Sequence, residues 1–159
     1  MPGHEDRQLI QQRWQDERYP RDNSLALGSG FYCLFELPHE HPRLINKVWL
    51  PASDCDAHQD DEGLATLALC VAGNGALQAR AGECAAHGGD GFLALQEKDS
   101  EALIWLLVLR DTNPFNRVEI QDRHLYAEST SGVSVQIPLE RPDQLTLAWP
   151  CPLHCHRAR

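Results

Sequence analysis

The chain has 159 residues, of which 23 are Asp or Glu and 14 are Lys or Arg, and its net charge is −9. A chain of this length forms one domain and buries roughly two thirds of the surface that its unfolded form exposes, so its six cysteines are expected to be free thiols rather than a disulfide framework. The arginines are scattered and form no basic patch, so we expect no nucleic-acid partner.

Neither a leader nor a membrane segment is expected. The first residues, MPGHEDRQLIQQRW, lack the cationic start and the apolar centre of a signal peptide. The longest apolar run, Ala102–Leu109, is far shorter than the roughly 18 residues that a membrane-spanning helix needs. We therefore predict a cytoplasmic protein with no membrane partner.

The N-terminal segment favours a short helix. Residues 5–19 have helical preference, Ile10 and Trp14 lie in a narrow apolar stripe, and Pro20 ends the segment. Such a thin stripe predicts a surface arm, residues 1–25, rather than a core helix. The alternative is an arm that packs across a partner subunit.

The rest of the chain is typical of short strands separated by turns. Between Leu64 and Arg110, apolar runs alternate with the turn sequences GNG (73–75), AGE (81–83) and GGDG (88–91). Strands are predicted at 31–37, 44–50, 64–71, 76–80, 91–95, 102–109, 115–120, 132–139 and 144–149. The last three alternate apolar and polar residues, which indicates one buried and one wet face. Nine or ten such strands predict an all-β sandwich or barrel over residues 26–150.

The strand at 102–109 is apolar on both faces. One face carries the odd-numbered residues from Leu103 to Leu109, which we assign to the core, and the other carries Ile104, Leu106 and Val108. A second sheet covers only one of these faces. The other should meet either a homodimer partner, which we favour, or the N-terminal arm.

The order of turns and strands from Asp54 to Arg110 resembles that of the cupins. The resemblance rests on Gly73-Asn74-Gly75, Gly82-Glu83 and Gly89-Asp90, whose spacing is similar to the G-x-G, G-E and P-G-D elements of that family. It implies a double-stranded β-helix, or jelly-roll sandwich, preceded here by a short N-terminal helix or arm.

The usual cupin metal ligands are absent from the matching positions. Cupins typically bind a divalent metal through a His-x-His pair and a Glu in the first motif, and through one more His in the second. In this chain those positions fall on Asp60 and Glu62, on Thr66, and on Ser100. The resemblance therefore implies a cupin without its common metal ligands.

A first candidate metal site precedes the strand at 64–71. His58, Asp60 and Glu62 have i, i+2 spacing, so an extended chain turns them to one side, where they would form a hard site suited to Mn, Fe or Mg. The alternative is a solvated acidic loop.

A second candidate metal site lies in the C-terminal tail, residues 151–159. Cys151, His154, Cys155 and His156 are soft ligands of the kind that zinc prefers. Cys155 and His156 point apart in an extended chain, so the alternative is a packed tail without metal.

The predicted interior is apolar, which favours an apolar or amphipathic small ligand. This ligand would contact Trp49 or Trp105, with His58, Asp60 and Glu62 at the mouth of the barrel. The inward-facing residues expected around it are Leu67, Leu69, Val71, Leu77, Phe92 and Leu95. Solid filling of this interior by side chains would contradict the prediction.

Three functions are compatible with these features, because fold alone does not decide among them. We favour a small-molecule-binding protein that acts as a sensor or accessory protein. One alternative is an oxygenase or isomerase that uses His58, Asp60 and Glu62 with a divalent metal such as Fe, Mn or Zn. The other is a structural protein whose dimer surface is its function.

Overall fold

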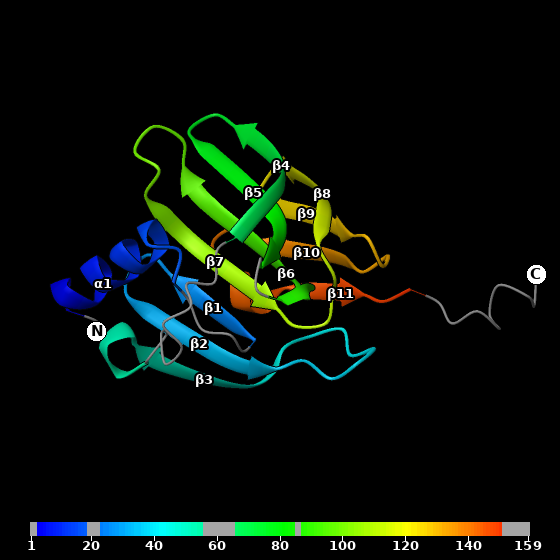
Figure 1. Cartoon of the computed structure of the whole chain (residues 1–159), viewed down its shortest axis with the longest axis horizontal. Coiled ribbons are helices and arrows are strands. Elements are labelled where there is room, and N and C mark those ends of the chain that lie inside the picture. Colours follow the sequence, from blue (N-terminus) through cyan, green and yellow to red (C-terminus); the bar gives the residue numbers. More distant parts are fainter. Residues whose placement is uncertain (1–2, 19–22, 56–65, 85–86, 151–159) are drawn as a thin grey trace, which may run out of the picture.

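The computed structural model describes residues 3–18, 23–55, 66–84 and 87–150 (Figure 1). Strands dominate, and one α-helix lies at the N-terminal end of the described chain. In chain order the elements are α1 (His4–Gln15), β1 (Ser24–Leu27), β2 (Phe31–Glu36), β3 (Ile45–Pro51), the 3₁₀ turn η1 (Ala52–Asp54), β4 (Thr66–Asn74), β5 (Leu77–Cys84), β6 (His87–Glu97), β7 (Leu103–Leu109), β8 (Phe115–Gln121), β9 (His124–Ser129), β10 (Ser134–Pro138), the 3₁₀ turn η2 (Pro142–Gln144) and β11 (Thr146–Ala148).

The strands form two antiparallel sheets. The larger has the order β3-β2-β1-β7-β6-β5-β4, and the smaller has the order β11-β10-β9-β8. Sheet neighbours are consecutive in the chain except for β1 and β7, which pair through Leu25↔Leu107 and Leu27↔Trp105. The all-β prediction is confirmed, although the sequence patterns missed β1 and β9.

The main core lies between the two sheets. The larger sheet contributes Leu107 and Trp105, and the smaller sheet contributes Phe115, Leu125 and Ile137, all at most 1% exposed. In β10 the predicted alternation is confirmed, because Val135 and Ile137 point into this core while the residues between them do not. Large side chains therefore occupy the space between the sheets.

A second core lies on the other face of the larger sheet, under α1. Ile10 is 1% exposed and belongs to one buried cluster with Phe92, Leu106 and Val108. Gln11 fixes the helix to the sheet, because its amide donates to the carbonyl of Leu103 and accepts from the Leu103 N–H. The N-terminal arm therefore covers the second apolar face of β7, and that face is not available to a dimer partner.

One assignment within β7 is wrong. The pairing of β6 with β7 shifts between Leu95↔Trp105 and Gln96↔Leu103, which inserts Ile104 as an extra residue. As a result Leu103 turns toward α1, whereas Ile104 packs against the core between the sheets. The strict alternation that the sequence suggests fails at this irregularity.

Two of the three predicted glycine turns are also wrong. The GNG segment does end β4, and Gly75, with φ of +62°, begins the two-residue turn into β5. Gly82 and Glu83 instead lie inside β5, paired with Phe92 and Gly91. The GGDG segment lies inside β6, where the pairing jumps from Cys84↔His87 to Glu83↔Gly91. These glycines accommodate an irregular strand rather than a chain reversal.

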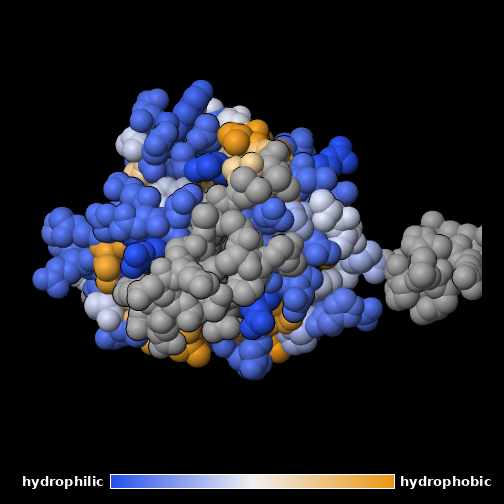
Figure 2. Space-filling model, in the orientation of Figure 1, coloured by the Kyte–Doolittle hydropathy of each residue, from blue (hydrophilic) through white to orange (hydrophobic). Residues whose placement is uncertain are grey.

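The described surface is mostly hydrophilic in the view of Figure 2, and its hydrophobic patches are small and separate. The large apolar side chains that are exposed are Val48 and Trp49 on β3 and Val71 on β4, the two edge strands of the larger sheet. No helix within the described residues is long and apolar enough to cross a membrane.

Candidate functional site

Both predicted metal sites fall outside the described residues. The first spans residues 58–62 and the second spans 151–156. Within the described ranges, no three His, Cys, Asp or Glu side chains lie close enough together to hold a metal ion. The two metal sites stay predictions.

The structure does not bring Trp49 and Trp105 together. Both belong to the larger sheet, but β2 and β1 lie between their strands. Trp105 is 1% exposed, and its Nε1–H donates to the carbonyl of Leu139 at 3.0 Å. Trp49 is 41% exposed at the sheet edge. In this arrangement Trp105 is a packing residue, and only Trp49 can contact a ligand from solvent.

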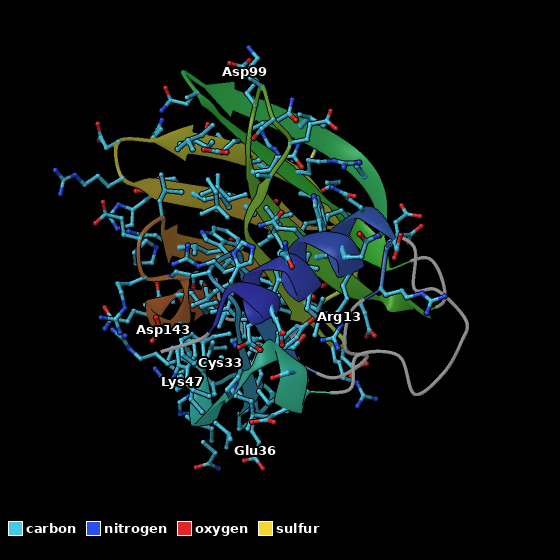
Figure 3. All side chains as sticks on the ribbon, turned by 90° about the vertical axis from the view of Figure 1, so that its left-hand side faces the viewer. Arg13, Cys33, Glu36, Lys47, Asp99 and Asp143 are labelled. Carbon is cyan, nitrogen blue, oxygen red and sulfur yellow. The ribbon has the colours of Figure 1, made fainter. Side chains whose placement is uncertain are left out.

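A buried carboxylate links the two sheets at one end of the sandwich. Asp143 in η2 has a 5% exposed side chain and accepts hydrogen bonds from Lys47 of β3 at 3.3 Å and from Arg141 at 3.2 Å. Figure 3 shows Lys47, Cys33 and Asp143 gathered in one region. Burial, with the nearby charge of Asp143, raises the pKa of the Cys33 thiol to about 11. Cys33 therefore stays protonated at neutral pH, and we interpret this cluster as structural.

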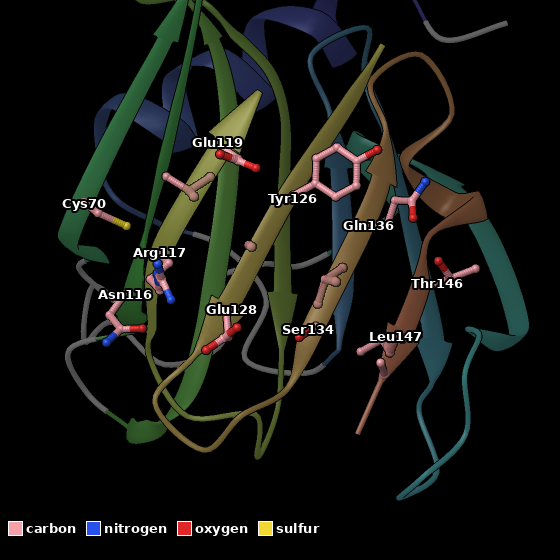
Figure 4. A pocket seen from close by; sticks show the side chains of 14 residues that line it. Cys70, Asn116, Arg117, Glu119, Tyr126, Glu128, Ser134, Gln136, Thr146 and Leu147 are labelled. Carbon is pink, nitrogen blue, oxygen red and sulfur yellow. The ribbon is translucent and has the colours of Figure 1, made fainter. Parts of the chain in front are cut away.

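A hollow lies on the outer face of the smaller sheet (Figure 4). Its volume is about 720 Å³, and it is open to solvent. Strands β8 to β11 supply its floor, and Cys70 of β4 lies at its edge. Because strand side chains alternate between faces, the residues between the core positions of these four strands all point to this side.

One row of polar side chains crosses the hollow from β8 to β11. Strand pairing places Glu119 opposite Tyr126, Tyr126 opposite Gln136, and Gln136 opposite Thr146. Tyr126 and Thr146 are half-buried, whereas Glu119 and Gln136 are exposed. The row combines a carboxylate, an aromatic ring, an amide and a hydroxyl group within cross-strand contact distance.

A second row runs beside the first. Here Arg117 lies opposite Glu128, Glu128 opposite Ser134, and Ser134 opposite Ala148. The pairing of β8 with β9 shifts between residues 115 and 117, so Asn116 is the extra residue at the start of this row. Figure 4 shows the side chains of both rows on the same face of the sheet.

The polar side chains of these two rows have hydrogen-bonding groups that the described part of the chain does not satisfy. Within the described chain, none of them forms a hydrogen bond or an ion pair with another protein group. On the larger sheet, by contrast, the Gln96 amide donates to Gln78 at 2.9 Å. The hydrogen-bonding capacity of the hollow is therefore available to solvent or to a ligand.

Cys70 at the edge of the hollow is not an activated nucleophile. Its Sγ donates to the carbonyl of Phe115 at 3.9 Å, and burial raises the pKa of its thiol. A protonated thiol is a poor nucleophile. Cys70 is half-buried, however, so it can report on occupancy of the hollow.

Sequence patterns pointed to the wet face of this sheet but not to a site on it. The alternation in 115–120, 132–139 and 144–149 predicts that every second residue faces solvent. Alternation within a strand does not predict the register between strands, and it is this register that aligns Glu119 with Tyr126 and Gln136. The unpredicted strand β9 supplies Tyr126, the centre of the row.

Comparison with known proteins identifies no family and no function for this chain. The chain matches no protein-family model, no curated protein and no solved structure, so its function has to be argued from the hollow and the side chains that line it.

Proposed function

We propose that this chain is a small-molecule-binding protein, a sensor or accessory protein, whose ligand occupies the hollow on the outer face of β8 to β11. The observation that carries the proposal is the unpaired row from Glu119 through Tyr126 and Gln136 to Thr146. A pocket with an aromatic side chain and a few polar groups in fixed positions is the usual form of a ligand site.

The hollow is a better location than the interior of the sandwich. Trp105, expected to line an inner pocket, is buried and hydrogen-bonded to Leu139. Phe115 and Leu125 fill the neighbouring space and are fully buried. A ligand between the sheets would have to displace such side chains, whereas a ligand in the hollow displaces only solvent.

The cupin resemblance and the jelly-roll form remain part of this proposal. Two antiparallel sheets and the hairpin turn after Gly73-Asn74 support it. The positions of Gly82-Glu83 and Gly89-Asp90 inside strands do not.

The homodimer also remains a proposal, but the structure gives it less support than the sequence pattern did. The apolar face of β7 that suggested it is covered by α1. A dimer would have to use another surface, and light scattering of the purified chain measures its mass directly. A monomeric mass at micromolar concentration would contradict the dimer.

The binding proposal can be tested by NMR with the isotope-labelled full chain. Pools of small fragments that differ in charge and polarity are titrated, and backbone amide shifts locate each binder. We expect binders whose shifts cluster at 117–119, 126–128, 134–136 and 146–148. The Tyr126→Ala, Gln136→Ala double variant should lose them, whereas Glu140→Ala, at an exposed turn position outside the hollow, should keep them. Binders that map elsewhere, or an absence of binders, would overturn the proposal.

A further inference from the structure

We infer that the hollow selects a small amphipathic molecule bearing a cationic amine, with the charged nitrogen between Glu119 and Tyr126. This inference rests on the proposed function and names the ligand class of the same site. Two features of the hollow support it, the distribution of charge along the two cross-strand rows and the position of the aromatic ring.

The carboxylates of the hollow are not equivalent. Glu128 lies directly opposite Arg117, so its row holds one negative and one positive side chain, although the two form no ion pair. Glu119 lies opposite Tyr126, and no cationic side chain occupies the described part of its row. Glu119 therefore places a negative charge beside the ring that no cationic side chain of the same cross-strand row offsets.

Tyr126 adds a second attraction for a cation at the same place. The face of a tyrosine ring is electronegative and attracts an ammonium group within about 6 Å of its centre. The ring is half-buried, so a ligand that covers it also removes apolar surface from water. His124 lies two residues before Tyr126 on β9, and the centroids of the two rings are 6.1 Å apart.

The remaining members of the row suit an ammonium group and its apolar substituent. Gln136 offers a carbonyl oxygen and Thr146 a hydroxyl oxygen, both acceptors for N–H donors. The methyl groups of Thr146 and Ala148 lie toward the far edge of the hollow and can contact the apolar part of the ligand. A chain with net charge −9 also attracts cations over longer distances.

Other ligand classes fit this charge distribution less well. An organic anion beside Tyr126 would meet the carboxylate of Glu119 and the net negative charge of the chain, and the Arg117 side chain of the second row lies opposite the carboxylate of Glu128. A neutral polyol could use the same hydrogen-bond acceptors, but it would leave Glu119 without a counter-charge. Charge is thus the property that separates the three classes.

The test compares three probes of similar size by NMR titration of the full chain: phenethylamine, phenylacetate and methyl glucoside. We expect phenethylamine to shift the amides around Glu119, Tyr126 and Gln136, and added salt to weaken its binding. Glu119→Gln should reduce its affinity about tenfold through loss of the charge. Glu140→Gln removes the same charge from an exposed position outside the hollow and should leave the affinity unchanged.

The outcomes separate this inference from the proposed function. If phenylacetate or methyl glucoside shifts the same amides as strongly as phenethylamine does, the cationic class is overturned and the hollow remains a binding site. If Glu119→Gln leaves phenethylamine affinity unchanged, the inference is likewise overturned. If none of the three probes shifts these amides, the amine class fails, and the fragment pools then decide whether the hollow binds any small molecule.

Discussion

At the scale of single residues, the buried carboxylates of Asp143 and Asp6 are held by hydrogen-bond partners. Asp143 accepts hydrogen bonds from Lys47 and Arg141, and Asp6 accepts one from the Ser53 N–H at 2.9 Å. An unpaired buried carboxylate would be strongly destabilising. These partners therefore stabilise the places where the chain brings acidic side chains into contact with its cores.

We predict that Asp143→Asn destabilises the protein at neutral pH and much less in acid. Burial alone would raise the pKa of Asp143, but the hydrogen bonds and charges of Arg141 and Lys47 hold it below its usual value. A carboxyl group with a lowered pKa stabilises the fold above its unfolded pKa of about 3.9 and loses this contribution as the pH falls through the lower folded value. Urea unfolding at pH 7 should show a loss of about 1–3 kcal/mol.

The same measurement near pH 2 tests the predicted direction of the pH dependence. A pH near 2 lies well below the unfolded pKa of the carboxyl group, where the stabilisation that its lowered folded pKa provides is being lost, so the difference between wild type and Asp143→Asn should shrink. Glu140→Gln, exposed in the neighbouring turn, is the matched control and should change stability little at either pH. An equal loss at both pH values would show that packing, not charge, explains the effect.

We predict that Gly91→Ala destabilises the fold by about 1–3 kcal/mol because β6 passes too close to the β7–β8 connection for a side chain. A Cβ at Gly91 would lie 2.5 Å from the carbonyl oxygen of Asn113 and 2.6 Å from ring carbons of Phe115. Gly73 is the control, since a Cβ there meets nothing nearer than the Leu77 carbonyl oxygen at 3.8 Å. In thermal unfolding experiments, Gly91→Ala should have a lower melting temperature than wild type, whereas Gly73→Ala should not. Similar losses in both variants would contradict the steric argument.

At the scale of elements, α1 depends on its contacts with the larger sheet. A helix of 12 residues is marginal in water on its own. It is held by the buried Ile10, by the two hydrogen bonds of Gln11 to Leu103, and by the cation–π contact of Arg13 with Tyr32 at 5.5 Å. The helix is therefore an integral part of the folded domain.

Shortening Ile10 should expose how much this attachment contributes. We predict that Ile10→Ala costs about 2–4 kcal/mol, since it removes a fully buried side chain from the cluster above Phe92 and Leu106. Gln8→Ala changes an exposed position of the same helix and should change stability little. Denaturant unfolding of both variants measures the difference. Equal stability of Ile10→Ala and Gln8→Ala would show that α1 contributes nothing to the fold.

The same element shows what sequence patterns can and cannot predict. A helix within residues 5–19 was predictable from local preference, but it ends at Gln15 rather than at Pro20. Its position on the sheet was not predictable, because polar residues such as Gln11 and Arg13 make part of its contacts. Strands with alternation, such as 132–139, were predictable with their buried faces. The displaced Ile104 and the alignment of Glu119 with Tyr126 depend on pairing between distant strands, which periodicity within one strand does not encode.

At the scale of the whole molecule, several contacts join the two sheets beyond their shared core. The loop between β2 and β3 bonds to β11, because the Leu147 N–H donates to the carbonyl of Pro42 and Trp149 Nε1 donates to that of His41. Asp143 and Lys47 add an ion pair between the layers at this end. The hollow lies on the opposite side of the smaller sheet from the core, so substitutions there leave this packing intact.

These connections predict that the sheets unfold together. Trp105 belongs to the larger sheet and donates to Leu139, which follows the β10 strand of the smaller one, so its fluorescence reports contact between the layers. A variant with Trp14 and Trp49 replaced by Phe keeps Trp105 and Trp149, which both donate hydrogen bonds between the layers, and should show fluorescence and far-ultraviolet circular dichroism transitions at the same urea concentration. If the fluorescence transition occurs at a lower urea concentration than the circular dichroism transition, the two sheets separate before their strands unfold. In that case neither sheet depends on the core they share, and the stability effects predicted for Asp143 and Gly91 would belong to separate units.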